Sequence, residues 1–365
     1  MMWIWLTACS WDTEKVSMER DAFDNGLMTL QNAFRSSADG LISLEIPVQD
    51  ADSNFLLTVI AQEGLTSLEA VYDPDGNIVL DAYDWFNADQ GLTDAVYAES
   101  NDMVLNWPPR MGDMPLREGN WVVEFSTLDN QGYYSSDIEG TAFTQIKQDS
   151  DFTQGTLVLS IGISPESYAE PDVVQAVNDA VDCWTEMWEP MGLSLDVSIS
   201  EMNISNELPW PSESPAIESL SASGSERDLL MLVGESIENE EGTFGIAGSV
   251  PGTLLSTQRA AVVISWLENA GVDGIFQEED VQLMCETMAH ELGHYLGLYH
   301  PVEMDYDAWD ALDDTVMCTD EFVCESELGD NLMYPYPVCS LNDCVNQVNL
   351  SENQLGVIHN YTGAL

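Results

Sequence analysis

The pattern of apolar and polar positions differs between the two halves of the chain. Within residues 40–148, short runs alternate between apolar and polar side chains, as at residues 41–46, 55–60 and 120–125, and the turn sequence Asp-Pro-Asp-Gly-Asn occupies residues 73–77. Alternation with a period of two is typical of half-buried strands, and about 100 residues of such strands favour two packed sheets. The pattern therefore predicts an all-β, sandwich-like accessory domain over residues 40–148.

Longer apolar elements occupy residues 151–365. Residues 157–163 are a short apolar run with β-branched side chains, which predicts a buried strand. Residues 171–188 place valine and tryptophan side chains on one helical face and precede Gly192, so they predict a helix that ends near this glycine. Three further strands are predicted at residues 193–199, 229–233 and 260–266. The pattern alone predicts an α/β domain, separated from the accessory domain by the polar residues 147–155.

The last predicted element is a helix over residues 352–361. Ser351 and Gln354 have the spacing of a capping box, in which the two side chains satisfy backbone N–H groups at the start of a helix. Gly363 follows the apolar positions and is suited to end the helix.

The N-terminus predicts export. Residues 1–8 are apolar with two tryptophans, and residues 6–9 resemble the site at which bacterial lipoproteins are cleaved and lipidated on cysteine. We expect residues 1–9 to be a lipoprotein signal, with Cys9 lipidated and anchored to a membrane, and residues 10–39 to be a linker. The alternative is that this stretch is no signal, because it is short and no lysine or arginine precedes it. No later segment is apolar and long enough to span a bilayer.

The remaining cysteines favour the same location. Without Cys9 the chain has six, four of them crowded near its end: Cys183, Cys285, Cys318, Cys324, Cys339 and Cys344. An even number suits disulfides in an oxidising compartment, so we predict an extracellular or outer-surface protein. Six cysteines allow fifteen pairings, and the sequence does not choose among them. A Cys183–Cys285 link would join the first predicted helix to the segment that contains most of the histidines.

Charge excludes one class of partner. The chain has 65 acidic and 8 basic residues, a formal net charge of -57 at pH 7. Nucleic-acid binding is excluded because phosphate contacts need a basic surface. Two interpretations remain: a solvated surface adapted to salt, or Ca²⁺ binding at the densest acidic cluster. That cluster comprises Asp305, Asp307, Asp310, Asp313 and Asp314. The acidic field also favours neutral or basic peptides over acidic ones.

Candidate chemistry is concentrated in residues 290–300, His-Glu-Leu-Gly-His-Tyr-Leu-Gly-Leu-Tyr-His. Three of the four histidines of the chain lie here, at His290, His294 and His300. Residues four apart share a helical face, so His290 and His294 can hold one ion, and Gly297 lets the chain turn so that His300 reaches the same ion. An apolar core helix is the alternative interpretation, but the apolar stripe of this segment lies on a different face from the histidines.

Three histidine ligands describe an open zinc site rather than a structural one. A closed structural site needs a fourth protein ligand, whereas three leave room for a water molecule, whose pKa zinc lowers toward neutrality. Glu291, adjacent to the first ligand, is placed to accept a proton from that water and to pass it to the leaving amine. These residues predict a zinc-dependent hydrolase with Glu291 as general base.

The same residues resemble a known clan. Residues 290–300 are similar to the extended zinc signature of the metzincin metallopeptidases, and Met333, in the sequence Asn-Leu-Met-Tyr-Pro, matches the methionine of the turn beneath the metal in that clan. The resemblance implies an α+β catalytic domain over residues 151–365, with a mixed sheet and a zinc-binding helix. It also implies that residues 245–252 form an edge strand that pairs with the substrate backbone, whereas the residues themselves are equally consistent with a glycine-rich loop.

Features of several metzincin families are combined in this chain. The spacing from His300 to Met333 and the cysteines between them resemble the pappalysin and cytophagalysin branch, some of whose members hold Ca²⁺ in this region. The turn itself is more similar to that of matrixins. Pro335 stands where the pappalysin branch usually has a tyrosine that acts as an extra ligand, so Tyr334 or Tyr336 would have to substitute for it.

These observations predict a zinc metalloendopeptidase that acts on protein or peptide substrates. The alternative is a non-catalytic, zinc-containing surface lipoprotein used for binding or adhesion, and Glu291 argues against it because a structural zinc needs no base. A zinc hydrolase that acts on non-peptide amides is disfavoured by the long cleft that strand pairing implies.

Overall fold

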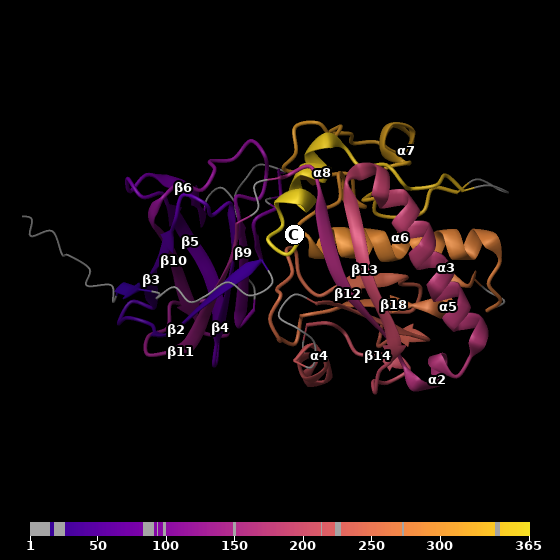
Figure 1. The fold of residues 1–365 in the computed structure, drawn as a ribbon, viewed down its shortest axis with the longest axis horizontal. Coiled ribbons are helices and arrows are strands. Elements are labelled where there is room, and N and C mark those ends of the chain that lie inside the picture. The colour runs from indigo at the N-terminus through magenta and orange to yellow at the C-terminus, as the bar shows by residue number, and fades with distance from the viewer. Residues whose placement is uncertain are drawn as a thin grey trace, which may run out of the picture.

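The computed structural model describes residues 15–17, 26–82, 91–92, 94–97, 100–148, 151–212, 214–222, 228–271, 274–339 and 344–365. These residues form a mixed α+β structure in two parts that lie side by side, a strand-rich part from the earlier residues and a part with helices from the later ones (Figure 1). The predicted signal at residues 1–9, including Cys9, lies outside the described residues.

Two five-stranded sheets make up the earlier part. One has the strand order β1 (Lys15–Ser17), β3 (Leu41–Val48), β10 (Gly119–Leu128), β5 (Leu65–Tyr72) and β6 (Ile78–Asp81). The other has the order β2 (Leu27–Arg35), β11 (Glu139–Lys147), β4 (Asn54–Ala61), β9 (Asp102–Trp107) and β8 (Val96–Tyr97). Side chains of both sheets form one hydrophobic core, in which the rings of Phe34 and Phe125 lie 5.2 Å apart and those of Trp107 and Trp121 lie 6.4 Å apart.

Strand β2 occupies residues that were expected to be part of a linker over residues 10–39. It pairs antiparallel with β11 along its whole length, from Leu27 opposite Lys147 to Arg35 opposite Glu139. The linker prediction does not hold for these residues. Because the partner strand follows 104 positions later, no local turn signal marks β2 as half of a strand pair.

The later part contains a third five-stranded sheet. Its order is β13 (Leu193–Glu201), β12 (Gly155–Ile163), β15 (Leu229–Gly234), β18 (Val262–Ser265) and β17 (Gly245–Ala247). The strands are parallel except for the edge strand β17, which is antiparallel to β18. Helices α3 (Pro171–Trp188) and α6 (Glu278–Tyr295) share a core with one face of the sheet, and α4 (Pro215–Ser221) shares a core with the other. Alternate residues of β15 therefore enter different cores, Met231 on the side of α6 and Leu232 on the side of α4.

Local signals predicted several of these elements correctly. Helix α3 has the predicted bounds and leads through η1 (Glu189–Met191) to Gly192, whose φ of 81° favours glycine. The last helix, α8 (Glu352–Asn360), begins with the predicted capping box. In it the Ser351 hydroxyl accepts a bond from the Gln354 N–H at 3.1 Å, and the Gln354 side chain accepts one from the Ser351 N–H at 2.9 Å.

The two parts of the molecule share a buried interface. Arg259 of the later part donates to Asp102 of β9 at 2.9 Å, and both side chains are almost fully buried. The end of the chain also reaches the earlier part, because the Thr362 N–H donates to the Asn106 side chain at 3.0 Å. Figure 1 shows the C-terminus between the two parts. Polar groups shielded from water therefore set the orientation of one part against the other.

Six cysteines form three disulfides. The pairs are Cys183–Cys285, Cys318–Cys324 and Cys339–Cys344. The first pair joins α3 to α6, which is the link that the sequence suggested, and the other two close short loops. Three disulfides are consistent with an extracellular protein.

A membrane-spanning helix was not expected beyond the N-terminus. Among the described residues, no helix is both long and apolar enough to cross a bilayer.

Candidate metal centre

The histidines of α6 and of the loop that follows it converge on one point. His290 and His294 lie one turn apart on α6, and His300 comes after the helix. Nε2 of His300 lies 3.1 Å from Nε2 of His294 and 3.3 Å from Nε2 of His290. Two nitrogens bound at roughly 2.0–2.1 Å to one tetrahedral zinc are roughly 3.4 Å apart, so the spacing fits a shared ion. In the part of the chain that the structure describes, these three residues are the one group of its kind close enough to hold a metal.

The other ring nitrogen of each histidine is held by an acceptor. Nδ1 of His290 lies 2.6 Å from the Leu332 carbonyl oxygen, and Nδ1 of His294 lies 2.7 Å from that of Leu298. Nδ1 of His300 lies 3.0 Å from a carboxylate oxygen of Glu303. Each acceptor selects the tautomer with its proton on Nδ1 and leaves the Nε2 lone pair directed at the common point.

These partners were not identified in the sequence. Two of them are backbone carbonyls, which carry no sequence signal at all. Glu303 could have been found, because an acidic residue three positions after the third ligand is within reach of its ring. The groups that hold the three Nδ1 atoms therefore come from the turn after the helix and from the segment around Leu332.

Burial keeps the two helical histidines neutral. Removal from water, followed by the proximity of His300, lowers the pKa of His290 to about 3 and lowers the pKa of His294 as well. A neutral imidazole is the form that binds a metal through its lone pair. The pair is therefore ready to ligate over the whole neutral pH range.

Glycine and methionine shape the turn that brings His300 back. Gly297 has a φ of 115°, and the N–H of Leu298 donates to the Gly293 carbonyl at 3.0 Å, which ends the helix. Met333 is fully buried beneath α6, where a Cβ on Gly293 would lie 2.6 Å from its Sδ. The absence of a side chain at Gly293 lets the methionine pack against the helix between His290 and His294.

Glu291 lies between the histidines and the edge strand β17. A Cβ on Gly245 of this strand would lie 2.6 Å from Cγ of Glu291, so the two residues are in close contact. Burial raises the pKa of Glu291 to about 8, although a hydrogen bond from the Ala247 backbone acts in the opposite direction. A divalent cation at the histidines would favour the carboxylate form and lower this pKa.

The glycine-rich segment at residues 245–252 is a strand only in part. Gly245–Ala247 form β17 at the edge of the sheet, and no strand is assigned to residues 248–252. Gly252 instead packs on the aromatic ring of Tyr295, and its N–H donates to the Tyr295 carbonyl at 2.7 Å. The first three residues of the segment therefore form a strand, and the rest form a loop.

The aspartates of the predicted calcium site have separate partners within the protein. Asp310 lies in β19 (Trp309–Asp310) and accepts bonds from the Thr315 hydroxyl and the Leu312 N–H. Asp314 accepts from the Ser351 hydroxyl and the Asn353 N–H at 2.9 Å each, at the start of α8. The other members of the cluster, Asp305, Asp307 and Asp313, are exposed. Acidic residues that are neighbours in sequence here serve different partners, so we make no proposal of Ca²⁺ at this cluster.

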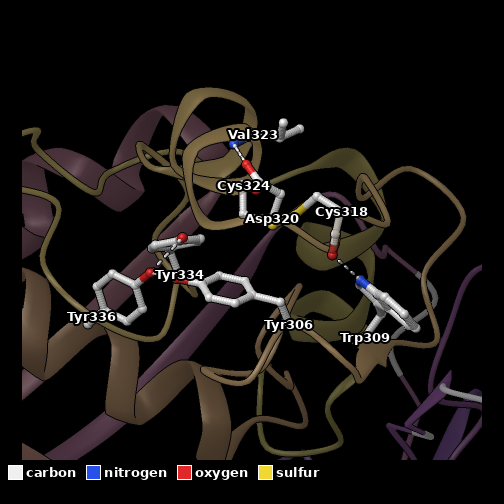
Figure 2. The surroundings of a disulfide bond; sticks show 8 residues. All are labelled: Tyr306, Trp309, Cys318, Asp320, Val323, Cys324, Tyr334 and Tyr336. Atoms are coloured by element: carbon white, nitrogen blue, oxygen red, sulfur yellow. Dashed lines mark hydrogen bonds between the residues drawn. A yellow bond between two sulfur atoms is a disulfide. The ribbon is translucent and has the colours of Figure 1, made fainter.

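The segment between His300 and Met333 is organised around the disulfide Cys318–Cys324 (Figure 2). The indole of Trp309 donates to the Cys318 carbonyl at 2.9 Å, and Asp320 caps α7 (Glu321–Leu328). The tyrosines suggested as extra ligands lie beside it. Their hydroxyls, on Tyr334 and Tyr336, are 3.2 Å apart, and that of Tyr336 also bonds Tyr306. These hydroxyls thus bond to one another rather than to the histidines.

Comparison with known proteins gives little further information. No protein-family model matches the chain, and no curated protein matches it. Among solved structures, metalloproteinase-II from Bacteroides fragilis aligns with a TM-score of 0.30 and 15% identity over 62% of this chain and 63% of its own. The pre-peptidase C-terminal domain of collagenase from Bacillus anthracis aligns with a TM-score of 0.21 and 11% identity, over 37% of this chain and 95% of its own. Superpositions with TM-scores this low do not assign a fold or a function.

Proposed function

We propose that this protein is a zinc-dependent endopeptidase of the metzincin type with Glu291 as general base. The convergence of three histidine Nε2 atoms, each with its Nδ1 held by an acceptor, carries the proposal. Glu291 stands next to the first of these ligands on the same helix. A carboxylate in this place serves hydrolysis, whereas a metal bound for stability alone needs no base.

The donors fit zinc by their chemistry. Imidazole nitrogens are preferred zinc ligands, and three of them leave one coordination position open. When bound, zinc supplies a Lewis acid that polarises a carbonyl oxygen and acidifies water. Glu291 accepts the proton of the attacking water and delivers it to the leaving amine nitrogen. His290, His294 and His300 keep their orientation during this exchange because their Nδ1 atoms are tied to the protein.

Strand β17 supports a peptide rather than a small-molecule substrate. It is the edge of the sheet and contacts Glu291 through Gly245. An extended peptide that pairs with this edge would be bound through its main chain, largely irrespective of its sequence, and would cross the site beside the base. The net charge of -57 favours neutral or basic peptides. The three disulfides agree with action outside the cytoplasm, and a lipid anchor on Cys9 stays a prediction.

The proposal is tested by hydrolysis of an unstructured protein such as casein by the full-length chain. We expect cleavage that a zinc chelator abolishes and that added zinc restores. Glu291→Gln should lower the rate by about 10²–10⁴-fold while bound zinc stays near one per chain, because only the proton acceptor is lost. Glu279→Gln, on an exposed part of α6, is the matched control and should retain the rate.

One result would favour the non-catalytic alternative. If the wild-type chain binds one zinc but cleaves nothing, also with added salt and Ca²⁺, the protein keeps its metal for binding or adhesion and the proposal is wrong.

A further inference from the structure

The segment 248–259, which follows the edge strand β17, lies against the earlier part of the molecule. Figure 1 shows strands β4 and β9 on the side of the earlier part that faces the later part. Leu56 of β4 and Val104 of β9 belong to the hydrophobic core of the later part, and Leu254 of the segment belongs to the same core. The segment therefore leads from the edge of the third sheet into the interface between the two parts.

One side chain joins the end of β17 to the earlier part. Nε of Arg259 donates to the carbonyl oxygen of Gly248, the residue directly after β17, at 3.1 Å. Nη1 of the same guanidinium donates to Asp102 of β9 at 2.9 Å. Arg259 and Asp102 are almost fully buried, so water does not compete for these bonds. Because the guanidinium is planar and rigid, the position of Asp102 determines where Nε points, and with it where β17 ends.

A second connection leads to the end of α6. The hydroxyls of Thr58 in β4 and of Thr253 in the segment lie 2.8 Å apart, and both residues are buried. The carbonyl oxygen of Thr253 accepts a bond from the hydroxyl of Tyr295 at 2.7 Å. Tyr295 is the last residue of α6 and directly follows His294. Hydrogen bonds thus run from the earlier part, through one residue of the segment, to the helix that contains two of the three histidines.

The segment has little room to shift. A Cβ on Gly248 would lie 2.0 Å from the carbonyl oxygen of Arg259, and a Cβ on Gly252 would lie 2.1 Å from the ring of Tyr295. A close-packed interior has low compressibility and transmits strain. A displacement at the interface would therefore reach both β17 and the end of α6.

We propose that the earlier part of the molecule positions the edge strand β17 for substrate binding. Asp102 acts through Arg259 on the end of β17. Thr58 acts through Thr253 on the segment 248–259 and on the end of α6. Both are positioning residues, because each acts through another residue.

The inference rests on the proposed peptidase function, since β17 needs a fixed position only if a peptide pairs with it. Hydrogen bonds between strands weaken steeply when donor and acceptor are misaligned, so a displaced edge holds the main chain of a peptide less tightly. A weaker hold on the edge should therefore appear as a higher KM.

Two substitutions of equal size at the interface form a matched pair. Thr58→Val removes the hydroxyl that bonds Thr253, and Thr362→Val removes the hydroxyl that donates to Asn106 of β9 at 2.8 Å. Both threonines are fully buried, so each variant loses one shielded hydrogen bond between the two parts. The first bond leads to the segment 248–259, and the second leads to the end of the chain.

The test measures kcat and KM of the full-length variants on one unstructured peptide substrate. In Thr58→Val we expect KM to rise about fivefold, the equivalent of one neutral hydrogen bond, with bound zinc unchanged. In Thr362→Val we expect KM to stay within about twofold of the wild-type value, because partial loss of folded protein lowers the apparent kcat and not KM. Thr58→Ser keeps a hydroxyl and should return KM to the wild-type value. Asp102→Asn weakens the bond to Arg259 by removing its charge and should raise KM by at least about fivefold.

A wild-type KM in Thr58→Val, or the same rise in both valine variants, would refute the positioning role while the peptidase stands. Should Thr58→Val not fold, Thr58→Ala removes the same bond without adding a methyl group and is judged by the same KM. If the wild-type chain cleaves neither the peptide nor an unstructured protein, the peptidase proposal fails, and the positioning role fails with it.

Discussion

The histidine site and the interface between the two parts are both networks of buried polar groups, but they differ in how the sequence encodes them. The three converging histidines and Glu291, the proposed base, all lie within residues 290–300. At the interface, Arg259 and Asp102 are 157 positions apart, and Thr362 and Asn106 are 256 apart. A helix and one turn suffice to assemble the first network, whereas the second exists only after both parts have folded. The histidines and Glu291 can therefore be found in the sequence. The contacts that join the two parts of the molecule cannot.

The buried ion pair between the two parts should contribute more to the free energy of unfolding than an exposed ion pair does. Arg259→Met leaves Asp102 charged, buried and without its ion pair, so we expect the free energy of unfolding to fall by about 3–5 kcal/mol. Arg35→Gln removes an exposed pair with Glu139 and should cost less than about 1 kcal/mol. Denaturant unfolding of the full-length variants at pH 7 measures both. If the free energy of unfolding fell equally in the two variants, the buried pair would stabilise the protein no more than the exposed pair.

The contact between β17 and α6 should affect kcat. Gly245→Ala places a methyl group 2.6 Å from Cγ of Glu291, so the base must move, and misplacement by about 1 Å costs on the order of 10²-fold in rate. We expect kcat to fall by roughly 10- to 100-fold with bound zinc unchanged. Gly112→Ala is the control, because nothing lies within 4 Å of its new Cβ. Full activity in Gly245→Ala would mean that β17 does not position the base.

The sequence predicted those features that depend on neighbouring residues. Helix α3, the capping box of α8 and the convergence of the three histidines follow from spacing within one or two turns. Strand β2 was missed because its pairing is decided by a strand 104 positions away.

The candidate site was also incomplete in the sequence. Nδ1 of His300 lies beside Glu303, and Glu286 lines the same cavity as Glu291, yet neither glutamate belongs to the motif. Calcium at the acidic cluster was predicted from density along the chain. Asp310 and Asp314 of this cluster bond to different segments, and calcium there stays a prediction.

The smallest effect is expected at Asp94, which lies between β7 (Gly91–Leu92) and β8, and it should appear as a dependence of stability on pH. Asp94 is 2% exposed, neither carboxylate oxygen has a hydrogen-bond partner within the described residues, and burial raises its pKa well above 3.8. An acid with a raised folded-state pKa costs nothing below its unfolded pKa, and the cost grows as the pH rises through the interval between the two values. Asp94→Asn should therefore stabilise the protein by about 1 kcal/mol at pH 7 and by nothing near pH 3.

The test compares the thermal stability of Asp94→Asn with that of the wild type from pH 3 to pH 7, with the exposed Asp305→Asn as control. A loss of stability in Asp94→Asn at pH 7 would contradict the argument, because it would show that the folded protein stabilises the anion.

We expect the local histidine motif, and not the acidic surface, to build the metal centre. The most direct measurement is anomalous diffraction at the zinc absorption edge from crystals of the full-length chain grown with zinc and calcium. We predict one dominant zinc peak, about 2.0–2.1 Å from Nε2 of each of His290, His294 and His300. A zinc peak among the aspartates at residues 305–314, with none at the histidines, would show that the histidine motif is not the metal centre.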